Sequence, residues 1–370
     1  MKSKRIYYIG HIKDIDSLWK YWHIKDESIM RRYVWDNSDP EIVITSSYIY
    51  SNRDCFNEFE RLYKNPYRRV FLAFVDEMFS PDMMLHDFAV VWTPFNLGER
   101  LYRIPFSIRG SKNRNENGHL SFYNDISEAT ARKLLSEKKF CNYIYSNQYA
   151  IPFRERIFHE LSKYKAIDSL GAHLHNVDKP FDRWNENWYE DSIINKAGYK
   201  FSIAVENGIY SGYATEKILT SLYAHTIPIY YGDPDITYEI NPKCFINARN
   251  YNCMADLINE IKRIDSNDDE WVRMVCESWY TESQIYNIER DMERFRQLLY
   301  QLAEEDNSKL IKRPIGTYTL NYYTRFFKHR FSNGLFERTG RAIKKIYSEK
   351  VKKETYMLWP LNQIISDIDK

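Results

Sequence analysis

Short apolar segments alternate with helix-like segments along most of the chain. The apolar runs lie at 5–9, 41–51, 68–77, 88–95, 142–146, 165–171, 200–207, 226–232 and 243–251. Between them, segments such as 56–63, 151–164 and 213–225 repeat apolar residues at helical spacing. Strands that alternate with helices in this way predict a mostly parallel α/β sheet.

A polar, turn-rich stretch at 109–122 divides this pattern into two successive halves. A chain of 370 residues is long enough for two domains with separate cores. We expect an N-terminal α/β domain over residues 1–140, a second α/β domain over 141–307, and a C-terminal tail over 308–370. Within the second domain, 268–305 is predicted to be one long helical tract.

The composition is that of a soluble globular protein, with 44% apolar and 28% charged residues. Only 12 Gly and 12 Pro exclude a collagen-like or low-complexity chain, and 31 Tyr are atypical of disorder. No apolar run reaches the ~18–20 residues of a membrane span, and no apolar core follows the basic N-terminus. The five cysteines lack CxxC spacing, which favours a reducing compartment without structural zinc or disulfides. We therefore expect a cytoplasmic protein.

The net charge of +2 conceals a basic tail on an acidic body. Residues 308–353 contain 13 Lys and Arg against two acids, a net charge of about +11. In this stretch Ile343, Ile346 and Tyr347 fall on one helical face, as in basic helices that lie on anionic membranes. A helix docked on the body with a solvated charged face fits equally well. No nucleic-acid recognition module accompanies the charge, so we expect peripheral membrane association and no nucleic-acid partner.

The segment most informative about chemistry is 201–235, which is predicted to form a strand, a glycine-containing loop, a helix and a second strand. Lys217 in the first turn of the helix opposes the helix dipole unless an anion lies there. A bound diphosphate would remove this conflict, and Glu216 beside it could accept hydrogen bonds from sugar hydroxyls. An ordinary strand–helix–strand unit with a solvated Glu–Lys pair remains the alternative, because neither GxGxxG nor GKT is present.

The same segment resembles the donor-binding signature of the GDP-fucose-dependent α-1,3/4-fucosyltransferases, whose bacterial members build Lewis-type antigens. The family pattern is F-x-[IL]-x-F-E-N, then Y-x-T-E-K, an apolar helix and [IV]-P-[IV]-x-x-G. The chain keeps it at Glu206, Asn207, Tyr213, Thr215, Glu216, Lys217, Pro228 and Gly232. It departs at Val205 and Ala214, where Phe and a larger apolar residue are usual.

Two further stretches extend the resemblance to roughly residues 65–250. The stretch 146–176 is similar to a family block, S-N…R…L-x-x-Y-x-x-I-D-x-x-G, whose arginine corresponds to Arg154. The stretch 69–95 is similar to a first-domain block in which a glutamate precedes Ser-Pro, and this places the glutamate at Glu77. About two extra residues precede it here, so Asp76 remains an alternative.

The resemblance implies a GT-B type glycosyltransferase, with two Rossmann-like domains facing a cleft. The N-terminal domain would bind the acceptor and the C-terminal domain GDP-fucose, without a bound metal or cofactor. Glu77 would take the proton of the acceptor hydroxyl. Arg154, bidentately, and Lys217, as a point charge, would stabilise the departing diphosphate.

The remaining roles implied by the resemblance concern binding of the donor. Tyr213 and Asn207 would donate hydrogen bonds to the phosphates, and Glu216 would accept from ribose hydroxyls. The activity implied is inverting transfer of fucose to a GlcNAc-containing glycan, in α-1,3 or α-1,4 linkage, as in the synthesis of Lewis-type or O-antigen lipopolysaccharide. A related enzyme with another nucleotide sugar, and a catalytically silent glycan- or nucleotide-binding protein, are the alternatives.

Overall fold

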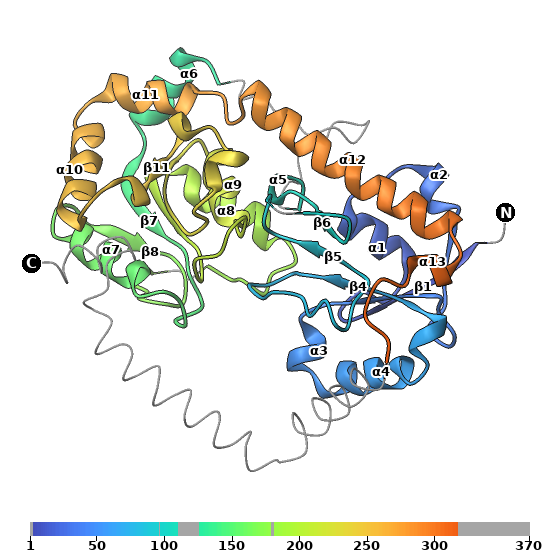
Figure 1. The fold of residues 1–370 in the computed structure, drawn as a ribbon. Helices are drawn as coiled ribbons and strands as arrows, with labels where there is room; N and C mark the ends of the chain where they lie inside the picture. Colours follow the sequence, from blue (N-terminus) through green and yellow to red (C-terminus); the bar gives the residue numbers. More distant parts are fainter. Residues whose placement is uncertain (1–2, 96, 110–125, 179–180, 317–370) are drawn as a thin grey trace, which may run out of the picture. The chain divides into compact units, whose positions relative to one another are not determined.

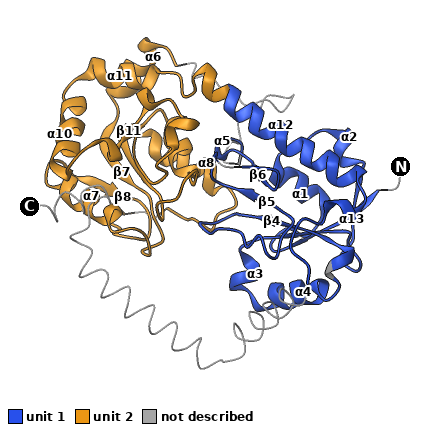
Figure 2. Cartoon of the chain, viewed as in Figure 1, with its two compact units in different colours: residues 1–109, 286–342 blue, residues 110–285, 343–370 orange. Residues whose placement is uncertain are grey.

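The structure is a computed structural model that describes residues 3–95, 97–109, 126–178 and 181–316. The chain divides into two compact units (Figure 2): unit 1 combines Met1–Arg109 with Tyr286–Ala342, and unit 2 contains Gly110–Ile285 with Ile343–Lys370. Of the described residues, 126–140 therefore group with unit 2 and 286–307 with unit 1, which differs from the boundaries expected at 140 and 307. Unit 1 is built from two stretches that lie far apart in the sequence.

Unit 1 contains a six-stranded sheet in the order β2-β1-β3-β4-β5-β6, and every neighbouring pair is parallel (Figure 1). Its strands are β1 (Lys4–Ile9), β2 (Tyr33–Trp35), β3 (Ile42–Thr45), β4 (Val70–Phe74), β5 (Phe88–Val91) and β6 (Leu101–Arg103). All residues of β3, β4 and β5 are buried, as expected for parallel strands covered on both faces.

The helices of unit 1 each bury apolar side chains. They are α1 (Ile15–Trp22), α2 (Glu27–Met30), α3 (Tyr48–Ser51), α4 (Arg53–Tyr63), α5 (Phe106–Arg109), α12 (Glu282–Glu304), whose first residues lie in unit 2, and α13 (Asn307–Leu310). In α4, Phe56, Phe59 and Tyr63 recur at helical spacing and are buried in one apolar cluster. The side chain of Asn52 accepts the first free N–H groups of this helix and fixes where it begins.

Two buried ion pairs tie the C-terminal segment of unit 1 to its sheet. Arg103 of β6 contacts Asp291 of α12 at 2.9 Å, and both side chains are almost fully buried. Asp87, just before β5, pairs with Arg313 and also accepts the backbone N–H of Arg313 at 3.0 Å. Residues up to Arg313 are therefore part of the body of unit 1, although the sequence assigned them to a separate tail.

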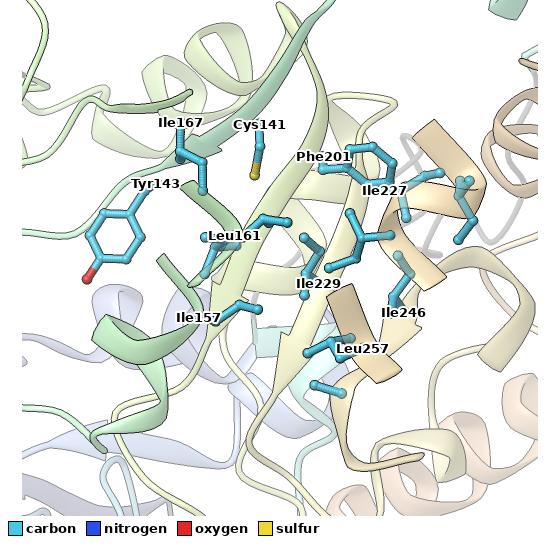
Figure 3. Close-up of a cluster of buried hydrophobic side chains, with 14 of the residues drawn as sticks. Cys141, Tyr143, Ile157, Leu161, Ile167, Phe201, Ile227, Ile229, Ile246 and Leu257 are labelled. Atoms are coloured by element: carbon cyan, nitrogen blue, oxygen red, sulfur yellow. The ribbon is translucent and has the colours of Figure 1, made fainter. Parts of the chain in front are cut away.

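Unit 2 contains a five-stranded parallel sheet in the order β11-β10-β9-β7-β8. Its strands are β7 (Lys139–Tyr143), β8 (Ile167–Ser169), β9 (Tyr199–Val205), β10 (Ile227–Tyr231) and β11 (Ile246–Asn247). One face of the sheet supplies alternate residues to the apolar cluster in Figure 3, among them Cys141, Phe201 and Ile229. Ile157, Leu161 and Leu257 of two helices cover this face.

The helices of unit 2 lie on both faces of its sheet. They are α6 (Glu128–Leu135), α7 (Phe153–Ser162), α8 (Trp188–Ala197), α9 (Glu216–Tyr223), α10 (Met254–Asp265) and α11 (Asp268–Cys276). Helices α7 and α10 contribute to the cluster of Figure 3, whereas α9 packs on β9 and β10 and beside α8. The doubly wound α/β class expected from the sequence is confirmed in each unit.

Some local expectations were wrong. Residues 48–51, assigned to a strand, form the short helix α3, and the helical tract 268–305 is interrupted between α11 and α12. The pattern also missed β2, β6, α2 and α8. The expected loop at 109–122 lies outside the described residues apart from its first position, as does the tail beyond residue 316.

Candidate functional site

The two sheets share one strand order. If the strands of each unit are numbered from 1 along the chain, so that β7 is the first strand of unit 2, the order is 2-1-3-4-5 in both units, and unit 1 adds a sixth strand at the end. In this order the chain reverses direction across the sheet between the first and third strands. Ligands of open α/β sheets bind at such a switch point, beyond the carboxyl ends of the strands. In unit 2 the switch point lies between β7 and β9, where the predicted donor-binding segment begins.

Glu206, the first residue after β9, organises this switch point. Its side chain is fully buried, and Oε1 accepts the backbone N–H of Thr215 at 2.9 Å, at the start of α9. Oε2 accepts from Lys217 Nζ at 3.0 Å. Gly232 after β10 makes room for it, because a Cβ there would lie 2.5 Å from Glu206 Cγ. A buried carboxylate thus caps the N-terminus of α9, where the dipole favours negative charge.

The loop between β9 and α9 is held against the end of β10. Gly212 has a φ of +74°, a conformation that favours glycine, and its N–H donates to Asp233 Oδ1 at 2.7 Å. The same oxygen accepts from the backbone N–H of Asp235, whose Oδ2 accepts from Ser211 Oγ at 2.6 Å. Asp233 and Asp235 therefore shape the loop, and both are engaged by backbone or hydroxyl donors.

Lys217 and Glu216 form the first turn of α9. Desolvation alone would lower the pKa of Lys217, but the carboxylates of Glu206 and Glu216 outweigh it and raise that pKa. Burial would raise the pKa of Glu216, but the charges of Lys217 and Lys196 and the hydrogen bonds at the start of the helix together outweigh it and lower that pKa. Both groups are therefore ionised at neutral pH. Within the chain, Glu206 is the anion that offsets Lys217, so the charge conflict at this helix start does not by itself require a bound diphosphate.

Arg154 of α7 lies beside the same strand end. Its Nη2 donates to the carbonyl of Val205 at 2.9 Å and to Asn207 Oδ1 at 2.7 Å. The guanidinium carbon lies 4.1 Å from the ring centroid of Tyr145, and only 1% of the residue is exposed. Arg154 therefore fixes Asn207 and supplies charge from beneath the surface.

Tyr213 belongs to the loop that precedes α9 and is 3% exposed. Its neighbour Ala214 and the last residue of β9, Val205, are fully buried. These two positions, where the chain departs from the fucosyltransferase pattern, are core positions. Of the predicted donor residues, the structure brings Arg154 into direct contact with Asn207, and Lys217 into contact with Glu216 at 3.5 Å.

Glu77 and Asp76 lie in unit 1, directly after β4 and at the carboxyl edge of that sheet. Glu77 is exposed, and its carbonyl accepts from Trp92 Nε1 at 3.2 Å. Asp76 is half-buried, and its Oδ1 accepts the backbone N–H of Ser47 at 2.9 Å. Both carboxylates therefore lie where ligands of such sheets bind, and the geometry within unit 1 leaves both as candidates for the base.

The described residues contain neither a candidate metal site nor a candidate membrane-spanning helix. Within these ranges no cluster of three or more His, Cys, Asp or Glu side chains has the arrangement of a metal site. In the same part of the chain, no helix combines the length and hydropathy needed to cross a bilayer.

Sequence reasoning missed three side chains of this region. Glu206 belongs to the quoted signature, but its position just after a strand gave no indication of a capping role. Tyr145 accepts the N–H of Val205 at 2.6 Å, and its hydroxyl donates to the carbonyl of Ile203 at 2.8 Å. Lys196 of α8 is 5% exposed and lies against α9. Nothing in the sequence around Tyr145 or Lys196 distinguishes them from other tyrosines and lysines.

Comparison with protein families identifies this region. The sequence profile described as "Glycosyltransferase family 10 (fucosyltransferase) C-term" matches residues 134–313. This part of the chain belongs to glycosyltransferase family 10. The family 10 region includes all of the switch-point residues of unit 2 and ends at Arg313, the buried partner of Asp87.

Curated relatives match over shorter stretches. A putative fucosyltransferase of Acanthamoeba polyphaga mimivirus is 38% identical over 146 residues, 38% of this chain and 24% of the relative. An alpha-(1,3)-fucosyltransferase of Helicobacter pylori is 28% identical over 38% of this chain and 28% of the relative. A GDP-fucose protein O-fucosyltransferase 3 of Xenopus laevis is 32% identical over 36% of this chain and 29% of the relative. The aligned stretch thus spans less than a third of each relative.

Among solved structures, an alpha1,3-fucosyltransferase matches with a TM-score of 0.63 and 18% identity. The match covers 85% of this chain and 93% of that chain. The structure of an alpha1,3-fucosyltransferase with GDP-fucose matches with a TM-score of 0.57 at the same identity, over 82% of this chain and 91% of that chain. The chain therefore has the GT-B type fold expected from the sequence.

Proposed function

We propose that the protein transfers L-fucose from GDP-fucose to an acceptor hydroxyl. The observation that carries this proposal is the family 10 region itself, which folds into a switch-point site with Lys217 at the start of α9 and Arg154 at the end of β9. A cation at a helix N-terminus beside a strand switch point suits a diphosphate.

The residues of unit 2 would hold the donor. Lys217 provides the charge that stabilises the leaving diphosphate, since its side chain is 16% exposed and its ammonium remains protonated. Arg154 adds charge and holds Asn207, which is half-buried and supplies a hydrogen-bond donor. Glu216 accepts from ribose hydroxyls, and Tyr213 lines the loop. This site needs no resident metal or cofactor in our proposal.

A carboxylate that follows β4 in unit 1 would start the reaction. A sugar hydroxyl is a weak nucleophile, so a carboxylate must take its proton as the new C–O bond forms. We assign this role to Glu77, with Asp76 as the alternative. Attack opposite the leaving GDP inverts the anomeric centre. We propose a GlcNAc-containing glycan as the acceptor, as the resemblance implies.

Release of GDP from GDP-fucose, measured with and without acceptors, tests the proposal. The panel contains N-acetyllactosamine, its Galβ1-3GlcNAc isomer, and a folded protein acceptor, because a relative is named as a protein O-fucosyltransferase. We expect acceptor-dependent release of GDP and a fucosylated glycan product. A donor panel of GDP-mannose and UDP-sugars separates a related transferase. Binding of GDP-fucose without any release would instead support a silent binding protein.

We also propose that the basic C-terminal segment attaches the protein to anionic membranes. Each cation near an anionic surface contributes ~1 kcal/mol, and salt screens this attraction. We expect full-length protein to float with vesicles that contain anionic lipid at low salt, and to lose this binding at high salt. The control is truncation after Gly316, which keeps the Asp87–Arg313 pair. Equal flotation of both proteins, or none at low salt, would refute membrane attachment by this segment.

A further inference from the structure

A buried lysine lies beneath the helix that carries the donor signature. Lys196 of α8 is 5% exposed, and its Nζ donates to three oxygens of α9. These are the carbonyl of Lys217 at 3.1 Å, Thr220 Oγ1 at 2.6 Å and Ser221 Oγ at 3.1 Å. All three donors of its protonated form are thus directed at the first two turns of α9, which carry Glu216 and Lys217.

The amine of Lys196 has no ion-pair partner among the described residues. The charged groups that act on it are Glu216 and Lys217 on α9, and Glu206 at the end of β9. Burial lowers the pKa of Lys196 to about 7, and the attraction of Glu216 is partly offset by the repulsion of Lys217. A lysine in this position exchanges between charged and neutral forms near neutral pH.

We propose that Lys196 is a third cationic group of the diphosphate site, and that binding of a nucleoside diphosphate draws a proton onto its amine. The proposal rests on the proposed function, because it needs a diphosphate at the start of α9. Lys196 touches neither diphosphate nor sugar, so it is a positioning residue that acts through α9. Its amine adds positive charge beneath Lys217, and the protonated fraction increases when the anion is present.

Electrostatics couples the binding of a diphosphate to the protonation of Lys196. A diphosphate beside Lys217 adds negative charge near Lys196, which favours the protonated amine and raises the pKa of Lys196. Between the lower and the raised pKa, the complex binds more protons than the free protein, so binding must weaken as pH rises. For a rise of about one pH unit in that pKa, affinity falls about fivefold between pH 7 and pH 9.

Lys196→Met removes the charge while the fold is kept. The hydroxyls of Thr220 and Ser221 already donate to the carbonyls of Glu216 and Lys217, at 2.7 and 2.8 Å. The substitution therefore leaves no buried hydroxyl proton without an acceptor, and methionine fills the same channel. We expect the variant to melt at the same temperature as the wild type or higher, because burial disfavours the ammonium.

Lys138 provides a matched control at the opposite end of the same helices. Its Nζ donates to the carbonyl of Ala197, after which α8 ends, and to that of Ala224 after α9 at 3.4 Å. Burial lowers its pKa to about 8. Helix α9 has eight residues, so Lys138 lies about 10 Å from the first turn along the helix axis. Lys138→Met removes a similar titratable amine far from the proposed diphosphate.

Titration calorimetry with GDP at pH 8, in buffers of different ionisation enthalpy, measures the protons taken up on binding. A terminal phosphate ionises near pH 6 and histidine near 6.5, so neither interferes strongly. For a rise of about one pH unit in that pKa, we expect uptake of about 0.4 proton in the wild type and in Lys138→Met, and little in Lys196→Met. GDP affinity should then fall between pH 7 and pH 9 in the first two proteins only.

The outcomes separate this proposal from the proposed function. If GDP fails to bind the wild type at pH 7, the donor assignment itself fails. If GDP binds but Lys196→Met takes up as many protons as the wild type, Lys196 is not the coupled group. If the wild type binds GDP without taking up protons, the linkage is overturned and Lys196 is a structural residue.

Discussion

Lys217→Ala lowers the turnover of GDP-fucose by about 10²–10³-fold, the usual effect of removing one preorganised charge donor at a developing anion. The ammonium of Lys217 is the charge that the start of α9 presents beside the switch point, and Glu206 holds it in place at 3.0 Å. Steady-state GDP release at saturating GDP-fucose and acceptor measures the effect. An exposed lysine of the same unit, Lys139, serves as the control, and Lys139→Ala should keep normal turnover.

A loss of folding would produce the same decrease, because Lys217→Ala leaves the carboxylate of Glu206 buried without its ion pair. Breaking such a pair costs about 3–5 kcal/mol of unfolding free energy. The double variant Glu206→Gln/Lys217→Met removes both charges and should recover most of the melting temperature while turnover stays low. Near-normal turnover in this folded double variant would remove Lys217 from the proposed chemistry.

Glu77→Gln lowers the rate of fucose transfer by about 10²–10⁴-fold, the range for loss of a general base. It leaves the affinity for GDP-fucose unchanged. The predicted donor residues lie in unit 2 and Glu77 is an exposed residue of unit 1, so we expect the substitution to leave the fold of the donor-binding unit intact. Single-turnover product formation, together with GDP-fucose titration, separates the two effects.

Asp76→Asn is the matched comparison for Glu77→Gln. The amide oxygen of asparagine still accepts the N–H of Ser47, now 2.9 Å from Asp76 Oδ1, so the local structure is kept. We expect this variant to retain most of its activity. An inactive Asp76→Asn beside an active Glu77→Gln would move the base by one residue, and two active variants would place it elsewhere.

The alternation of apolar segments was enough to predict the parallel strands and the helices that separate them. It worked best where the pattern is unbroken, as in α4, whose buried residues recur at helical spacing, and in β9, which is an apolar run buried along almost its whole length. It failed at Tyr48–Ser51, whose aromatic and β-branched residues favour a strand although the chain turns into α3 there. The three-residue strands β2 and β6 are too short to show a period.

For the site, the sequence located the segment that forms it but not the buried charged groups, Glu206 and Lys196, that surround α9. Lys217 and Glu216 were found because helix starts follow known charge rules. That Glu206 folds back to cap α9 depends on Gly232, 26 positions later in the chain, which no local pattern reports. Lys196 is hidden for a related reason, since a lysine within the polar helix α8 looks solvated until α9 covers it.

The division of unit 1 between the two ends of the sequence also constrains the order in which the protein folds during its synthesis. Residues 1–109 leave the ribosome first, but Trp22 must wait for Phe295, whose ring centroid lies 5.3 Å away in the finished unit, and Asp87 must wait for Arg313. The described core of unit 2 is complete by residue 285. Synthesis from the N-terminus should therefore reverse the usual order of domain folding, because the second unit can fold before residues 286–313, which the first unit needs, have been made.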